Sequence, residues 1–284
     1  MFRNTNSRIL IGKVGDFYGF NWCGLDYFCF FAKSKTSNKM NRFTKTIAAV
    51  MLIVAAIIVA GCNKPDGPKN VSGNYNGHDY VDLGLPSGTL WATCNVGADT
   101  PEGYGDYFAW GETEPKAVYY WDTYKYCEGD LHSLTKYCCD STYGYNGFVD
   151  NLTELQIEDD AAVANWGDVW RMPTETQWKE LMDNTVATWT LRNEVQGLLF
   201  SANNGNALFL PASGSGDYLG GGNNGFGYIG HYWSSSHYVG DIIGSDEDVY
   251  KTGVWNLNFN SSGCSMRIGC RAFGMSVRPV CYIE

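Results

Sequence analysis

Several chemical signatures are absent from this sequence of 284 residues. It has no Gly-x-Ser-x-Gly motif, so a nucleophile elbow of the hydrolase type is not indicated. The glycine run at 220–222 lacks the Lys-Ser/Thr that follows a phosphate-binding loop, and no Cys-x-x-Cys spacing suggests zinc. Histidines are few and scattered, which favours surface or hydrogen-bonded roles; they are His78, His132, His231 and His237.

Basic residues are scarce after residue 61. Residues 1–61 hold 8 of the 20 basic and 2 of the 30 acidic residues, which leaves 12 basic and 28 acidic residues in 62–284. Nucleic-acid binding requires a basic surface, so we expect no nucleic-acid partner. An acidic surface of this kind keeps an exported protein soluble.

An apolar run near the amino terminus indicates export. Arg42 and Lys45 precede Ile47–Ala60, whose fourteen residues would make a helix of about 21 Å, short of the roughly 30 Å core of a bilayer. We therefore predict a signal peptide at 40–61 rather than a transmembrane helix.

The end of the apolar run, Val59-Ala60-Gly61-Cys62, resembles the lipobox of bacterial lipoproteins. The resemblance implies that the Cys62 thiol is lipidated and becomes the first residue of the mature chain. Several acyl chains would hold the protein firmly at a membrane. We expect a cell-envelope location, at the outer membrane or cell surface; the alternative is that Cys62 is an ordinary thiol.

The domain organisation follows from these signals. Residues 1–39 fit poorly before a signal peptide, so we expect translation to start at Met40 and 1–39 to be an upstream extension. Residues 62–77 are rich in Pro and Gly and are interpreted as a flexible tether. Residues 78–284 are long enough for one domain.

Short alternating segments predict a strand-dominated α+β domain with one or two helices and long loops. Thr174 precedes the clearest helix, with Gln177 at capping-box spacing and Trp178, Leu181 and Met182 as its apolar stripe. A second helix is expected at 158–165. Strands are expected at 79–85, 89–96, 107–110, 188–192, 197–201, 207–211, 228–235, 249–259 and 276–282.

Six segments occur in an order that resembles a known family: HDYVDLGLPSGTLWATCNVGA (78–98), GDYFAWGETEPK (105–116), WRMPTETQWKELMDN (170–184), NGNALFLPASG (204–214), YWSSS (232–236) and SVRPV (276–280). They are similar to the Fibrobacter succinogenes major paralogous domain family, in the form found on lipoproteins of Bacteroides and its relatives. The family is more distantly similar to formylglycine-generating enzymes. The resemblance implies a C-type lectin-like fold and little chemistry.

Residues 113–150 form an aromatic, Gly-rich excursion where a ligand could bind. Rigid amphipathic rings suit recognition of glycans or protein surfaces. The alternative is that the rings pack the loop onto the sheet. The candidate ligand-binding residues are Tyr119, Tyr120, Trp121, Tyr124, Tyr143 and Tyr145. Four further residues are expected to be structural: Arg171, Trp178, Trp233 and Arg278.

Catalysis is not indicated by the cysteines or by the acidic clusters. Cys264 and Cys270 lie near the place where formylglycine-generating enzymes bind copper, but their spacing and surroundings differ from that motif. They could instead form a disulfide, as could Cys127 with Cys138 or Cys139. The acidic runs at 158–160 and 246–248 are interpreted as solvated charge rather than calcium ligands. We expect no cofactor and no metal.

These observations lead to three hypotheses. The leading one is a non-catalytic surface module, anchored by lipid, that binds a glycan or a protein. The second is a structural or adhesive subunit of a cell-surface assembly. The third and weakest is an oxidase similar to formylglycine-generating enzymes.

Overall fold

The computed structural model describes residues 71–216, 225–241 and 246–282. All the described residues belong to a single compact unit. The predicted upstream extension and the predicted signal peptide, together with Cys62, lie outside the described residues. Among the described residues, no helix is long and apolar enough to cross a membrane.

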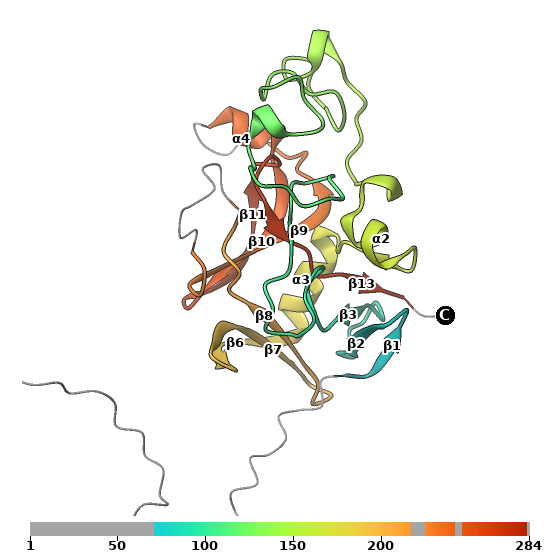
Figure 1. Cartoon of the computed structure of the whole chain (residues 1–284), viewed down its shortest axis with the longest axis vertical. Helices are drawn as coiled ribbons and strands as arrows, with labels where there is room; N and C mark the ends of the chain where they lie inside the picture. The colour runs from blue at the N-terminus through green and yellow to red at the C-terminus, as the bar shows by residue number, and fades with distance from the viewer. Residues whose placement is uncertain (1–70, 217–224, 242–245, 283–284) are drawn as a thin grey trace, which may run out of the picture. The chain divides into compact units, whose positions relative to one another are not determined.

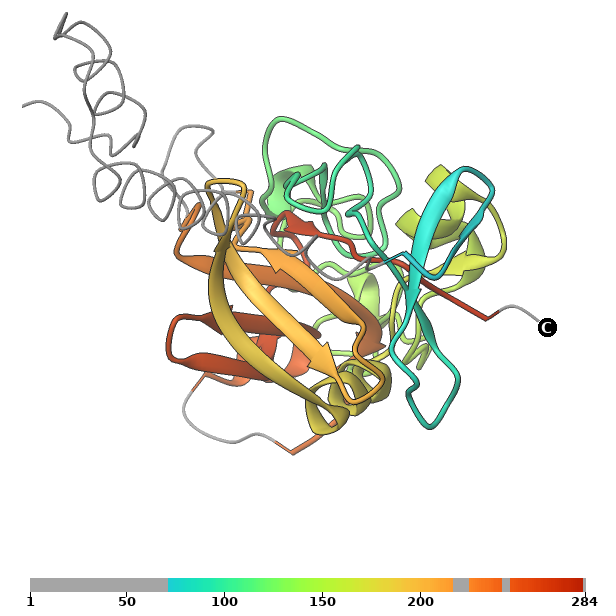
Figure 2. The same ribbon diagram turned by 90° about the horizontal axis from the view of Figure 1, so that it is seen from below.

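The described strands form three sheets (Figure 1). The first has the order β1-β2-β3-β13-β5, with bounds Gly73–Tyr75, His78–Asp82, Leu90–Ala92, Val280–Cys281 and Trp170–Arg171. The second has the order β11-β10-β9-β12-β4, with bounds Gly263–Gly269, Val254–Asn260, Ile229–His237, Met275–Ser276 and Tyr107–Phe108. The third comprises β6 Thr185–Arg192, β7 Val195–Ala202 and β8 Ala207–Pro211, and crosses β9–β11 in Figure 2.

Three α-helices lie within the described residues: α2 Ala161–Trp166, α3 Glu175–Asn184 and α4 Glu247–Thr252. Three short 3₁₀ turns accompany them: η2 Trp121–Thr123, η3 Tyr145–Gly147 and η4 Ile157–Asp159. The predicted α+β class with mostly strands is confirmed. The predicted helix number was one too low, because α4 was expected to be part of a strand.

The predicted capping box at the start of α3 is confirmed. Thr174 Oγ1 accepts a hydrogen bond from the Gln177 amide at 3.2 Å, and Gln177 Oε1 accepts one from the Thr174 amide at 2.8 Å. Trp178 and Leu181 are fully buried. Local sequence therefore fixes both the start of this helix and the face that it buries.

The first sheet begins earlier than the sequence predicted. Strand β1 lies inside the segment 62–77 that was interpreted as a tether, and Gly73 pairs with Tyr80 of β2. A Cβ at Gly73 would stand 2.3 Å from the Tyr80 hydroxyl, so this close pairing requires glycine. Residues 73–77 therefore belong to a paired strand and its turn, and the tether prediction is wrong for them. The sequence did not indicate this strand, because so short a segment shows no alternating apolar pattern.

Two expected carboxy-terminal strands are also corrected. In the segment 249–259, α4 occupies the first residues and β10 begins only after Gly253, where a Cβ would meet the Val249 carbonyl at 2.1 Å. The segment 276–282 divides between two sheets, since β12 joins the second sheet and β13 the first. Strand β11, which pairs with β10 along its length, was not predicted.

Two hydrophobic clusters support the three sheets. One contains Trp110, Trp170 and Trp233, and the other contains Trp91 and Trp178. Each of these five indoles is 0% exposed, so each is removed from solvent. Their burial favours tight packing over a role in ligand contact.

Candidate functional site

The predicted aromatic excursion is packed against the sheets instead of forming an open binding surface. Tyr119 is 5% exposed, and its hydroxyl donates a hydrogen bond to the Tyr107 carbonyl. Its ring packs against Gly216 and Gly274, where an added Cβ would come within 2.9 and 2.8 Å of ring atoms. The prediction that Tyr119 contacts a ligand is therefore wrong, because two glycines admit its ring into the interior.

Two more candidates in the excursion are buried. Tyr124 is 3% exposed and donates to the Trp110 carbonyl at 2.8 Å. Tyr143 is 4% exposed and donates to Asp248 Oδ1 at 2.7 Å. Both rings are thus used in packing, which corrects their predicted role in ligand contact.

The other three candidates are at least partly exposed. Tyr120 and Tyr145 are 37% and 49% exposed. Trp121 is half-buried and packs edge-on against Tyr124, with ring centroids 5.8 Å apart. The six predicted residues consequently do not form one aromatic surface.

The acidic run at 158–160 is partly internal, which corrects its interpretation as solvated charge. Asp159 is 3% exposed and accepts hydrogen bonds from the Tyr126 hydroxyl and, at 2.6 Å, from the Tyr137 hydroxyl. Lys136 Nζ lies 2.5 Å from Asp159 Oδ2. Burial alone would raise the pKa of Asp159, but these hydrogen bonds hold it below its usual value.

Asp160, also 3% exposed, fixes the start of α2. Its Oδ1 accepts from the Ala162 amide at 2.8 Å, and its Oδ2 accepts from the Met172 amide at 2.9 Å. Burial raises the pKa of this carboxyl. The second acidic run, 246–248, is exposed. Among the described residues, no group of three or more His, Cys, Asp or Glu side chains could hold a metal ion.

Arg278 is fully buried and lies in the short segment between β12 of the second sheet and β13 of the first. Its Nε donates to Asn95 Oδ1 at 2.8 Å, and its Nη1 donates to the carbonyls of Ala92 and Thr93 at 3.1 and 2.6 Å. Burial lowers the pKa of its guanidinium. These bonds hold the β12–β13 crossing against β3.

The other three residues expected to be structural make backbone contacts. Trp178 Nε1 donates to the Trp233 carbonyl at 3.1 Å, and Trp233 Nε1 donates to the Phe108 carbonyl at 2.7 Å. Arg171 is half-buried, and its Nη1 donates to the Trp170 carbonyl at 2.8 Å and to the Asp168 carbonyl.

Sequence reasoning missed a second buried arginine. Arg271 is fully buried, and its Nη2 lies 2.7 Å from His237 Nε2. Burial and the charge of Arg271 lower the pKa of His237 to about 2, so the imidazole is neutral and Nε2 accepts the bond. His237 Nδ1 lies 3.5 Å from the Cys139 sulfur. No local sequence motif indicates this cluster, because its members come from three segments that are distant in the sequence.

The cysteines are free throughout the described part of the chain. Cys264 is in β11 and Cys270 follows its last residue, so about 20 Å of extended strand separates them. A disulfide or a shared copper ion between these two thiols is excluded by that distance. Burial raises the pKa of both.

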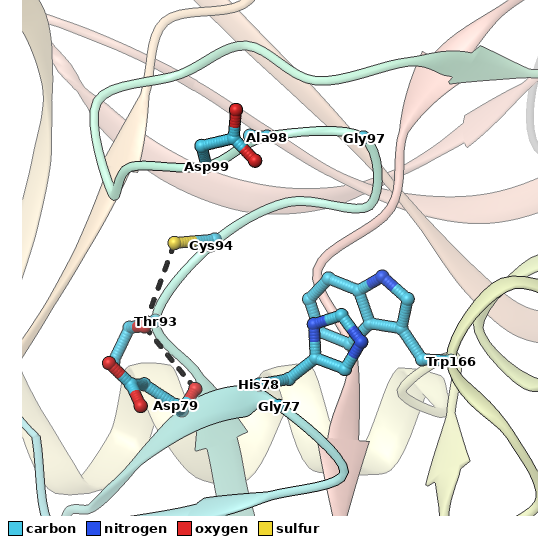
Figure 3. A pocket seen from close by; sticks show the side chains of 9 residues that line it. All are labelled: Gly77, His78, Asp79, Thr93, Cys94, Gly97, Ala98, Asp99 and Trp166. Carbon is cyan, nitrogen blue, oxygen red and sulfur yellow. Dashed lines mark hydrogen bonds between the residues drawn. The ribbon is translucent and has the colours of Figure 1, made fainter.

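A pocket of about 340 Å³ lies where β2, the residues after β3 and the end of α2 meet (Figure 3). The His78 and Trp166 rings form one wall, stacked with centroids 3.7 Å apart and planes 9° from parallel. Figure 3 shows Cys94 and Asp99 across the opening from these rings. The antiparallel pairing of β2 with β3 brings His78 and Cys94 to the same pocket.

The charge of this His78–Trp166 pocket is negative. Asp79 and Asp99 contribute carboxylates, and no Lys or Arg is among the lining residues. Burial lowers the pKa of His78 despite the opposing effect of Asp79, so its ring is neutral at pH 7. The pocket therefore offers hydrogen-bond acceptors beside an aromatic wall, a combination suited to hydroxyl- or amine-bearing ligands.

Neither the charge nor the motifs of the sequence singled out this pocket. His78 and Trp166 are 88 positions apart by residue number, and they meet only because α2 packs beside the first sheet. The stacked pair had no signal in the sequence beyond the residue types. Comparison of the chain with models of protein families, with curated proteins and with solved structures gives no match.

Proposed function

We propose that this protein is a lipid-anchored, non-catalytic module of the bacterial cell envelope that binds a glycan in the His78–Trp166 pocket. The motifs quoted above support membership of the Fibrobacter succinogenes major paralogous domain family and a C-type lectin-like version of the α+β fold. The lipobox-like segment ending in Cys62 supports the anchor. The separation of Cys264 from Cys270 argues against the oxidase alternative.

The stacked rings beside carboxylates are the observation that carries the binding proposal. The apolar face of a sugar ring packs on an aromatic side chain, while its hydroxyls donate to carboxylate oxygens. The pocket volume of about 340 Å³ lies in the range of small-molecule sites. Because its ionised side chains are acidic, the proposed ligand is a neutral or amino sugar rather than an acidic one.

A glycan array probed with the full chain in detergent tests this proposal. We expect retention of at least one neutral or amino-sugar glycan. Trp166→Ala should weaken its binding at least tenfold, because the ring wall is lost. Tyr145→Ala removes a 49%-exposed ring of the predicted excursion and should leave binding unchanged. Loss of binding in Tyr145→Ala alone would move the site to the excursion and defeat the assignment.

A further inference from the structure

A pocket of about 640 Å³ lies where the first half of α3 faces β5 and β13 of the first sheet, and we call it the β13 pocket. Arg171 and Val280, which are paired in the sheet, both line it. Trp170 precedes Arg171 and points to the other face, where its ring lies edge-on to His78 with centroids 6.1 Å apart. The β13 pocket and the His78–Trp166 pocket therefore lie on opposite faces of the first sheet.

Part of the wall of the β13 pocket is apolar. Leu155, Met172 and Val280 line it, and the last two are 3% and 1% exposed. Tyr282 also lines it and is 53% exposed, and its hydroxyl accepts a hydrogen bond from Gln177 Nε2 at 2.7 Å. The volume of the pocket is in the range of small-molecule sites, and its apolar wall suits a ligand with apolar side chains.

A carboxylate is held in place on the α3 side of the pocket. Glu180 Oε1 accepts a hydrogen bond from the Ser87 amide at 2.8 Å, and Oε2 accepts one from the Ser87 hydroxyl at 2.5 Å. Within the described part of the chain, no Lys, Arg or His nitrogen forms an ion pair with Glu180. A carboxylate has about four lone-pair sites, so Glu180 can still accept hydrogen bonds from a ligand.

A guanidinium with unused donors lies on the β5 side of the pocket. Arg171 Nη1 donates to the carbonyls of Asp168 and Trp170, whereas its Nε and Nη2 have no hydrogen-bond partner among the described residues. No described carboxylate lies within 4.0 Å of it. Opposite charges thus line one pocket without pairing with each other.

Two further carboxylates line the pocket and are occupied by internal donors. Asp160 accepts backbone amides through both oxygens, as described above. Glu154 accepts hydrogen bonds from the hydroxyls of Ser235 and Ser236 at 2.9 and 2.6 Å. The carboxylate on the far side of the pocket from Arg171 is that of Glu180, because Ser87 belongs to the turn that leads into β3, and β13 lies between β3 and β5.

We propose that the β13 pocket binds a dipeptide with apolar side chains, its carboxylate on Arg171 and its ammonium on Glu180. Two strand spacings separate β3 from β5, roughly 10 Å. Two extended residues span about 7 Å, and a charge-assisted hydrogen bond adds about 2.8 Å at each end. A dipeptide therefore spans the two charges better than a free amino acid, whose charged groups share one Cα.

A longer peptide cannot extend the sheet at this place. The outer edge of β5 is already used, because the Trp170 amide donates to the Gly167 carbonyl at 3.1 Å and the Met172 amide donates to Asp160. The proposed ligand is accordingly small. This second site goes beyond the proposed function, and either site can fail without the other.

Isothermal titration calorimetry of the full chain in detergent tests the proposal with alanyl-alanine, leucyl-leucine and phenylalanyl-phenylalanine. We expect at least one of the three to bind. Its N-acetyl derivative lacks the ammonium and its C-terminal amide lacks the carboxylate, so each should bind at least tenfold more weakly. Glu180→Gln should weaken the free dipeptide at least tenfold but leave the N-acetyl derivative unchanged. Arg171→Gln should show the same relation to the C-terminal amide.

Asp183→Asn is the matched control, because it removes an exposed carboxylate of α3 that does not line the pocket, and it should leave binding unchanged. Melting curves check that each variant folds, and if Arg171→Gln does not fold, the C-terminal amide on the wild type tests the carboxylate end. Binding of none of the three dipeptides would overturn the proposal. Equal binding of the free and N-acetyl forms would overturn it as well, as would a loss in Glu154→Gln with Glu180→Gln unaffected.

Discussion

Replacing Asp159 by Asn should destabilise the domain strongly. The side chain is 3% exposed and accepts hydrogen bonds from two tyrosine hydroxyls and from Lys136. A hydrogen bond to a charged group contributes about 1.5–3 kcal/mol, and the amide of Asn retains part of this while losing the ion pair. We expect the free energy of unfolding to fall by about 2–4 kcal/mol, measured by urea denaturation followed by circular dichroism.

Glu158→Gln is the matched control for this substitution. Glu158 also lies near Lys136, at 3.6 Å, but its side chain is 66% exposed. Exposed ion pairs contribute about 0–1 kcal/mol, so the free energy of unfolding should fall by less than about 1 kcal/mol in Glu158→Gln. A free energy of unfolding for Asp159→Asn within about 0.5 kcal/mol of wild type would refute the conclusion that the buried hydrogen bonds of Asp159 stabilise the domain.

The pH dependence gives a second check on Asp159. Its pKa is lower in the folded than in the unfolded chain, so its stabilising effect is present above the unfolded pKa of about 3.9 and is lost as pH falls. The difference in unfolding free energy between wild type and Asp159→Asn should therefore shrink between pH 5 and the acid limit of folding. A difference that stays constant would contradict the lowered pKa.

Three further predictions follow from other parts of the chain. Gly274→Ala places a Cβ 2.8 Å from the Tyr119 ring and should cost about 1–3 kcal/mol in urea denaturation; an unchanged midpoint would show that the ring is free to move. The imidazole of His237 should not titrate between pH 5 and 8 in an NMR titration, because burial and Arg271 lower its pKa to about 2, and a chemical-shift change in that range would contradict the Arg271 contact. Cys62→Ala should abolish the acyl mass on the mature protein and leave the precursor uncleaved. A mature product that differs from wild type only by the substituted side chain would disprove lipidation.

Sequence reasoning succeeded where a structure depends on neighbouring residues. The capping box of Thr174 and Gln177 and the buried stripe of Trp178 are local features, so their pattern predicted α3. The alternation around 79–85 and 89–96 likewise predicted the strands β2 and β3, although both strands are shorter than expected.

The failures arise from contacts between distant segments. Composition cannot distinguish a tyrosine at the surface from a tyrosine whose ring is buried against glycines distant in the sequence. Tyr119 is of the second kind, because Gly216 and Gly274 leave room for its ring. Strand β1 is too short to show a period, and its position depends on the Tyr80 ring across the hairpin. The stacking of His78 on Trp166 likewise requires the packing of α2 beside the first sheet.

A crystal structure of the protein with the neutral or amino-sugar glycan selected on the array is the decisive test of glycan binding in the His78–Trp166 pocket. A sugar ring should lie against the His78–Trp166 wall, with its hydroxyl or amino groups within hydrogen-bond distance of Asp99 or Asp79. A glycan bound over residues 113–150, with the His78–Trp166 pocket empty, would contradict it.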